Sequence, residues 1–119
     1  MSKGLSYEYT GTIGHIVDIA GNLPATGQGL IDSGWEEISL PQQAAAGHHT
    51  YKDPVTGLRI RYDEPKPGEK GFAGKPHYHI LNPDATGTSD MYLDKNGNPV
   101  KKNSKKSHIL PKGDNNDSD

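Results

Sequence analysis

The sequence contains no cysteine, and apolar residues are scarce in it. Without a thiol the chain forms no disulfide, has no cysteine nucleophile and builds no zinc–thiolate site. Apolar residues occupy 30% of the 119 positions, and no apolar run approaches the roughly 18 residues of a membrane-spanning helix. Glycine (15) and proline (9) are frequent, which disfavours a long helical bundle because both residues interrupt helices. These features predict one small domain that is rich in turns.

The formal net charge of -2 hides an uneven distribution along the chain. Residues 1–50 carry one Lys against five Asp and Glu. Residues 51–112 carry 12 Lys and Arg against 7 Asp and Glu, and residues 113–119 carry three Asp. A basic segment between acidic ends favours an anionic partner such as a nucleic acid. The same excess is also compatible with an ordinary solvated surface.

Turn residues divide the second half of the chain at short intervals, as in an antiparallel sheet. Residues 58–62 alternate with a period of two, so that Arg59 and Arg61 share the face opposite to the apolar side chains. A turn at 53–57 joins this strand to a strand at 48–51 in a predicted hairpin. Further strands are expected at 37–40, 75–81, 90–94 and 105–110.

The first third of the sequence is less regular. A weak alternation at 7–12 favours a short strand, and glycines within residues 13–23 argue against a regular element there. Residues 26–35 predict a short helix with Trp35 as a core anchor.

The fold prediction is α+β, with a short N-terminal helical region packed on a twisted antiparallel sheet of four or five strands. Within one domain, we expect an N-terminal irregular or helical segment at 1–33, a core at 34–112 and a disordered acidic tail at 113–119.

Three of the six histidines lie in the basic segment. On a strand, the spacing of His77 and His79 places both imidazoles on one face, about 6–7 Å apart. His108 lies on the last predicted strand, and if that strand is a neighbour, its ring joins the same face. The three side chains are therefore the candidate site.

Three interpretations of this histidine group remain open. In metal-independent RNA cleavage, one imidazole removes the 2′-OH proton and another protonates the leaving 5′-oxygen, roles that suit a pKa near about 6.5. In a metal site, His77 and His79 act with His108 or a carboxylate as ligands. In the third interpretation, the histidines are only exposed side chains on the solvated face of a sheet.

The first interpretation also needs cations for the phosphate. Arg59, Arg61 and Lys75 lie on or beside the predicted strands, and arginine suits bidentate phosphate contacts. Three further side chains are possible additional members of the site, namely His49, Ser107 and Tyr78. This interpretation requires no metal ligand and no cofactor.

Much of the chain from residue 34 to residue 111 resembles the C-terminal toxin modules of bacterial polymorphic toxins. Such modules end contact-dependent inhibition proteins, Rhs/WapA proteins and LXG-type secreted proteins. The segments that carry the resemblance are GWEEIS (34–39), GHHTY (47–51), TGLRIRYD (56–63), KPHYHILNP (75–83), YLDKNGNP (92–99) and SHI (107–109).

The resemblance implies a secreted effector domain for interbacterial competition, delivered from the producer cell surface into the cytoplasm of a target cell. It implies a metal-independent ribonuclease with a barnase/EndoU/colicin-like sheet, in which His77, His79 and His108 match the family's histidine positions. The implied partners are an RNA substrate and a cognate immunity protein, with the toxin either monomeric or in a heterodimer with that protein. The alternatives are a metal-dependent nuclease toxin such as a DNase, and a non-catalytic module whose basic face binds an acidic partner.

Overall fold

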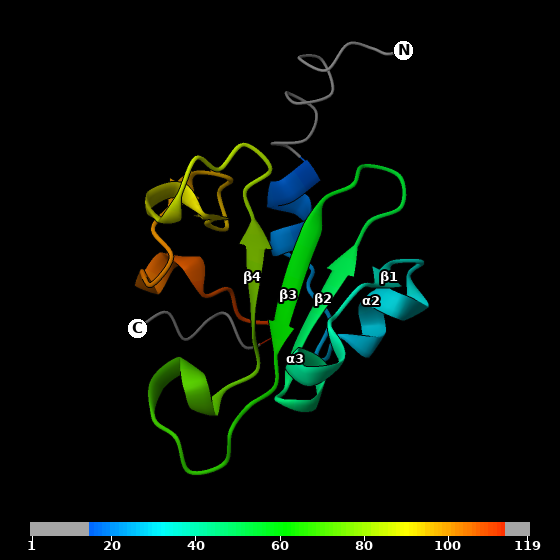
Figure 1. Ribbon diagram of the computed structural model, residues 1–119, viewed down its shortest axis with the longest axis vertical. Helices are drawn as coiled ribbons and strands as arrows, with labels where there is room; N and C mark the ends of the chain where they lie inside the picture. Colours follow the sequence, from blue (N-terminus) through cyan, green and yellow to red (C-terminus); the bar gives the residue numbers. More distant parts are fainter. Residues whose placement is uncertain (1–14, 114–119) are drawn as a thin grey trace.

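The computed structural model describes residues 15–113, which form short helical segments and one antiparallel sheet (Figure 1). The α+β prediction is confirmed, and the sheet has six strands where four or five were expected. The predicted strand at 7–12 and most of the acidic tail lie outside the described residues. No helix in the described part of the chain is both long enough and apolar enough to span a membrane.

All neighbouring strands of the sheet are consecutive in the sequence and antiparallel, in the order β1 to β6. The central hairpin of β2 and β3 is the one that the alternating pattern predicted, and its register pairs His48 with Asp63. The bounds of the strands are β1 Glu36–Glu37, β2 His48–Lys52, β3 Arg59–Asp63, β4 His77–Leu81, β5 Tyr92–Leu93 and β6 Pro99–Val100.

Short helices occupy the connections of the sheet. The predicted helix at 26–35 is present as the shorter α2, and the helical turn after Leu40 is α3, which begins with a proline that suits a first helical position. Three 3-10 turns follow between residue 71 and the end of the described residues. The bounds are α2 Gln28–Asp32, α3 Pro41–Ala45, η1 Gly71–Gly74, η2 Thr88–Asp90 and η3 Lys105–Ser107.

Two sequence predictions are wrong. Residues 15–20 are helical, because Ile16, Ile19 and Ala20 form an apolar stripe at helical spacing. The first half of the strand expected at 105–110 is the 3-10 turn η3. Only one bridge pairs this segment with the sheet, between Ile109 and Tyr78 of β4. That single bridge is nevertheless enough to fix the preceding residue, His108, beside β4.

The apolar core lies on one face of the sheet, and the candidate site lies on the other. Strand side chains such as Ile60, Tyr78 and Ile80 are fully buried against Ile16 and Leu23 of the N-terminal region. Trp35 packs against the margin of this core. In Figure 1 the helical segment 15–20, drawn in blue, passes behind β3. Because strand side chains alternate between faces, the opposite face holds His48 of β2, Arg61 and Asp63 of β3, and His77 and His79 of β4.

Candidate functional site

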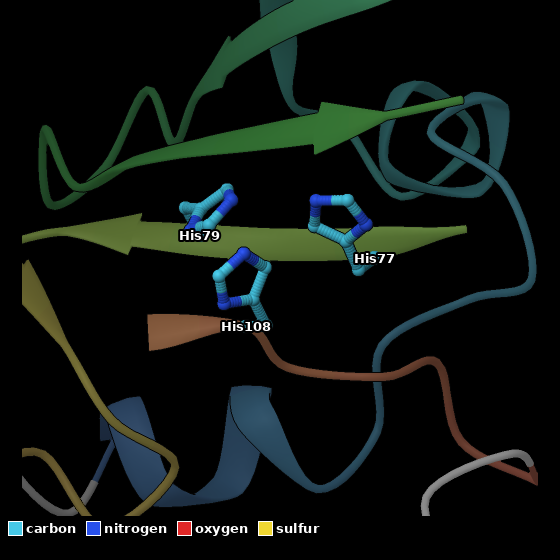
Figure 2. A group of neighbouring side chains, drawn as sticks. All are labelled: His77, His79 and His108. Atoms are coloured by element: carbon cyan, nitrogen blue, oxygen red, sulfur yellow. The ribbon is translucent and has the colours of Figure 1, made fainter. Parts of the chain in front are cut away.

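The three histidines singled out in the sequence come together on the polar face. His77 and His79 project from β4, and His108 projects toward them from the segment after η3 (Figure 2). Their ring centroids are 4.7 to 5.1 Å apart. The rings of His77 and His79 are almost fully buried, whereas His108 is half-buried. We call these three residues the histidine cluster.

A single carboxylate, Asp63 of β3, lies beneath the histidine cluster. Its Oδ2 is 3.1 Å from Nε2 of His77 and 3.5 Å from Nε2 of His79. The Arg61 guanidinium donates two hydrogen bonds of 2.9 Å to the same carboxylate, one to each oxygen. The Nδ1 of His48 lies 2.8 Å from Oδ1. Burial by itself would raise the pKa of Asp63, but these four partners hold it well below its usual range.

Cross-strand pairing explains why these residues meet. The register places Asp63 beside His77 on β4 and beside His48 on β2, and it places Arg61 beside His79. Directly paired residues in an antiparallel sheet project on the same side and lie within side-chain contact distance. The pairing of β2, β3 and β4 therefore surrounds the negative charge of Asp63 with polar side chains. We call this set the charge group; its members are Asp63, His48, Arg61, His77 and His79.

Hydrogen bonds to backbone carbonyls fix the tautomers of two of the rings. Nδ1 of His77 lies 3.0 Å from the Lys75 carbonyl oxygen, and Nδ1 of His108 lies 3.0 Å from that of Ser104. A carbonyl oxygen only accepts, so both Nδ1 atoms carry a proton. In His108 this leaves Nε2 as the nitrogen that exchanges a proton or binds a ligand.

Burial lowers the pKa of His79, because desolvation disfavours the charged imidazolium. Its Nδ1 is buried and has no hydrogen-bond partner. Burial also lowers the pKa of His108, and the charge of His77 lowers it further. Both rings are therefore neutral at pH 7. A neutral His108 with a protonated Nδ1 offers the lone pair of Nε2 as a general base.

Aromatic rings hold the histidine cluster in place. Phe72 of η1 stacks on His108, with ring centroids 4.5 Å apart and planes inclined by 14°. Tyr92 of β5 packs on His79 at 4.7 Å, and its hydroxyl accepts a hydrogen bond of 3.3 Å from Arg61. These contacts restrict rotation of rings that would otherwise turn freely about their side-chain bonds.

The cluster opens into a cleft of about 230 Å³. Besides the charge group, the cleft is lined by two lysines, Lys66 and Lys102, and by Glu64. Glu64 is 2.7 Å from Nε2 of His49, so its charge is shared with a neighbour. A recess with a guanidinium and two ammonium groups suits an anionic group of modest size, such as a phosphodiester.

Several residues that the sequence suggested do not reach this cleft. Arg59 and Lys75 are exposed and do not line it, and Lys75 contributes only its backbone carbonyl to the site. His49 faces the apolar side, where it lies between Glu37 and Glu64. Tyr78 is a core residue.

Two more of the suggested side chains form hydrogen bonds to backbone carbonyls. The hydroxyl of Tyr78 donates to the Pro24 carbonyl. The hydroxyl of Ser107 is buried and donates to the Ser104 carbonyl, so it supports the turn that carries His108. Of the six additional side chains that were suggested, only Arg61 lines the cleft.

The sequence analysis did not single out Asp63 or His48, although the pattern could have revealed both. The alternation that places Arg61 on the polar face also places Asp63 there, two residues later. Across the hairpin, the residue opposite Asp63 is His48, and paired residues project on the same side of the sheet. His49 therefore projects on the other side. Lys66 and Lys102 had no such indication, because they lie in loops. Tyr92 lies on β5, and only the pairing of β5 with β4 brings its ring beside His79.

The histidine cluster also has the composition of a metal site. One nitrogen from each of the three rings can be chosen so that all lie within 4.8 Å of one another. The carbonyl contacts of His77 and His108 resemble those that commonly orient metal-bound histidines. Zinc, with its preference for imidazole ligands, is the ion that such a set suits best.

Comparisons of the chain with models of known protein families, with curated proteins and with solved structures found no match.

Proposed function

We propose that this chain is a toxin domain that acts as a metal-independent ribonuclease. The observation that carries the proposal is the meeting of the histidine cluster with Arg61 and two lysines in one cleft. Ribonucleases that use no metal need a base, an acid and a cation for the phosphate, and imidazole serves both proton-transfer roles. The cleft supplies each of these groups.

The proposed reaction is attack of the ribose 2′-oxygen on the adjacent phosphorus. His108 removes the 2′-OH proton through Nε2, and Arg61 stabilises the negative charge that develops on the phosphate oxygens. The bond between phosphorus and the 5′-oxygen then breaks. The products are a 2′,3′-cyclic phosphate and a free 5′-OH, and no water is consumed in this step.

The toxin part of the proposal is supported by the sequence resemblance alone. It implies delivery into a competing bacterium and a cognate immunity protein that blocks the enzyme in the producer. Production of the active chain inside a bacterium without the immunity protein should therefore stop growth, and production of the His108→Ala variant should not.

The enzymatic part is tested by incubating the purified chain with total RNA in excess EDTA. We expect cleavage products that end in a 2′,3′-cyclic phosphate, detected by mass spectrometry. The variants His79→Ala and His108→Ala should lose this activity. His15→Ala is the matched control, because His15 is exposed and its ring contacts Asp53 rather than the cleft. Intact RNA after incubation with the wild-type protein would contradict the proposal.

A second candidate is the metal-dependent nuclease, which the spacing of the ring nitrogens favours. In that case His77, His79 and His108 would hold the ion, and Asp63 would orient the ring of His79 through its Nε2. A bound zinc ion would supply a Lewis acid and an activated water molecule. Activity that disappears in EDTA and returns with added Zn²⁺ would select this candidate over the first.

A further inference from the structure

His48 lies in the same cleft, on the opposite side of Asp63 from the histidine cluster. It belongs to β2 and pairs with Asp63 across the hairpin. Its Nδ1 lies 2.8 Å from Oδ1 of Asp63, and its side chain is 33% exposed. Ionised Asp63 only accepts hydrogen bonds, so Nδ1 of His48 carries the proton and Nε2 is left for a ligand.

The histidine cluster alone leaves one proton-transfer role unfilled. Both ring nitrogens of His77 are engaged, one with the Lys75 carbonyl and one with Asp63, and the side chain is only 7% exposed. The side chain of His79 is 4% exposed and its ring is neutral. Neither ring therefore offers an accessible proton to a leaving group. Of the imidazoles that line the cleft, His48 and His108 are the two that are not fully buried.

We propose that His48 is a further catalytic residue, the general acid that protonates the leaving 5′-oxygen, and that Asp63 positions it. This inference rests on the ribonuclease proposed above. An Asp–His pair in which the carboxylate binds Nδ1 holds the ring in one orientation and compensates the charge of the imidazolium. The other charged groups that line the cleft are Arg61, Glu64, Lys66 and Lys102.

The proton balance of the step is complete. Nε2 of His108 accepts the 2′-OH proton as the bond between the 2′-oxygen and phosphorus forms. His48 begins the step as an imidazolium with a proton on each nitrogen, and its Nε2 donates a proton to the 5′-oxygen as the bond between that oxygen and phosphorus breaks. The enzyme ends with His108 protonated and His48 neutral, and exchange with solvent restores the starting state.

The experiment compares two kinds of substrate that differ in their need for an acid. In a dinucleotide the leaving group is a 5′-alkoxide, which requires protonation. In a nucleoside 3′-(4-nitrophenyl phosphate) the leaving group is a nitrophenolate, which does not. Each of the four nucleosides is used, so that base preference does not hide the effect.

We expect His48→Ala to lower dinucleotide cleavage by about 10²- to 10⁴-fold and to leave nitrophenyl ester cleavage within a few-fold of the wild-type rate. His108→Ala should lose activity on both substrates, because both need a base. His15→Ala again serves as the control, and circular dichroism verifies that each variant is folded. For a second His48 variant, His48→Gln keeps a polar side chain beside Asp63 while removing the acid, so it should show the same selective loss.

Three other outcomes are possible, and each overturns a proposal. An equal loss on both substrates would assign His48 a structural role and overturn the inference. Wild-type rates on both would overturn it as well, while the ribonuclease proposal would stand. If the wild-type protein cleaves neither substrate, the ribonuclease proposal itself fails, and an acid role for His48 fails with it.

Discussion

Replacing Asp63 with asparagine should strongly destabilise the protein, because this carboxylate is the negative centre of the site. Its side chain is only 7% exposed, and four side chains contact it at 2.8 to 3.5 Å. The substituted side chain would be neutral, and its amide nitrogen could not accept the bonds that one carboxylate oxygen accepts now. The cation Arg61 would then lose its ion pair in a partly buried setting.

The magnitude follows from the burial of the two partners. Breaking a fully buried ion pair by removing one charge costs about 3–5 kcal/mol. Arg61 is 30% exposed, so water compensates part of its charge, and the lower end of that range applies. We therefore expect Asp63→Asn to lower the free energy of unfolding by about 3 kcal/mol at pH 7.

Urea denaturation followed by tryptophan fluorescence measures this difference, since Trp35 is the single tryptophan and packs against the core. Asp84→Asn is the matched control, because Asp84 is an exposed aspartate whose carboxylate should contribute little. The loss should diminish as the pH falls, because the low pKa of Asp63 contributes stability above the ordinary carboxyl pKa and that contribution disappears in acid. A difference of less than about 1 kcal/mol from the wild type would refute the central role of this carboxylate.

Three further predictions concern the surroundings of the site. Burial would lower the pKa of His49, but hydrogen bonds to two carboxylates raise it overall, so its contribution to stability is complete below about pH 6.5 and is lost as the pH rises through the raised value. The difference in unfolding free energy between wild type and His49→Gln should therefore be larger at pH 6 than at pH 9, and a difference that does not change with pH would contradict this. Phe72→Leu should reduce kcat for RNA cleavage by several-fold with little change in KM, because it removes the ring that stacks on His108; an unchanged kcat would show that the stacking does not position the base. Replacing the four lysines of residues 101–106 with glutamine should reduce the dependence of RNA affinity on salt concentration. For single strands, each phosphate contact contributes about 0.7 to the slope of the logarithm of the binding constant against the logarithm of the salt concentration. Fluorescence anisotropy of a labelled 2′-O-methyl oligonucleotide measures that slope, and an unaltered slope would place the RNA elsewhere.

The central hairpin was predictable because its second strand alternates without interruption and a turn precedes that strand. Residues 58–62 place apolar and polar side chains on opposite faces, and the turn before them contains Pro54 and Gly57 where a turn requires them. The same periodicity placed His77 and His79 on one face. These local patterns were sufficient to anticipate two of the three rings of the histidine cluster.

The end of the chain was harder to predict because tertiary contacts determine its conformation. Residues 105–110 have no alternating pattern, and local hydrogen bonds form the turn η3, including one of 3.1 Å from the His108 amide to the Lys105 carbonyl. The single bridge of Ile109 with Tyr78 then directs His108 toward the cluster. His108 thus reaches the expected site by a different local structure from the one that the sequence suggested.

The missed residues show what sequence patterns leave out. Asp63 looks like an ordinary polar residue at a strand end, and its burial arises only when β2 and β4 cover it on both sides. His48 and His49 are neighbours, and only the register of the hairpin decides that His48 faces the cleft. A shift of one residue in that register would exchange their roles.

The most direct test of the account is the cleavage of RNA by the purified chain in excess EDTA, with the products analysed for their ends. We predict 2′,3′-cyclic phosphates with the wild-type protein and none with His108→Ala. RNA that stays intact with the wild type, or cleavage that persists undiminished in His108→Ala, would contradict the proposal that imidazoles in this cleft break the phosphodiester bond.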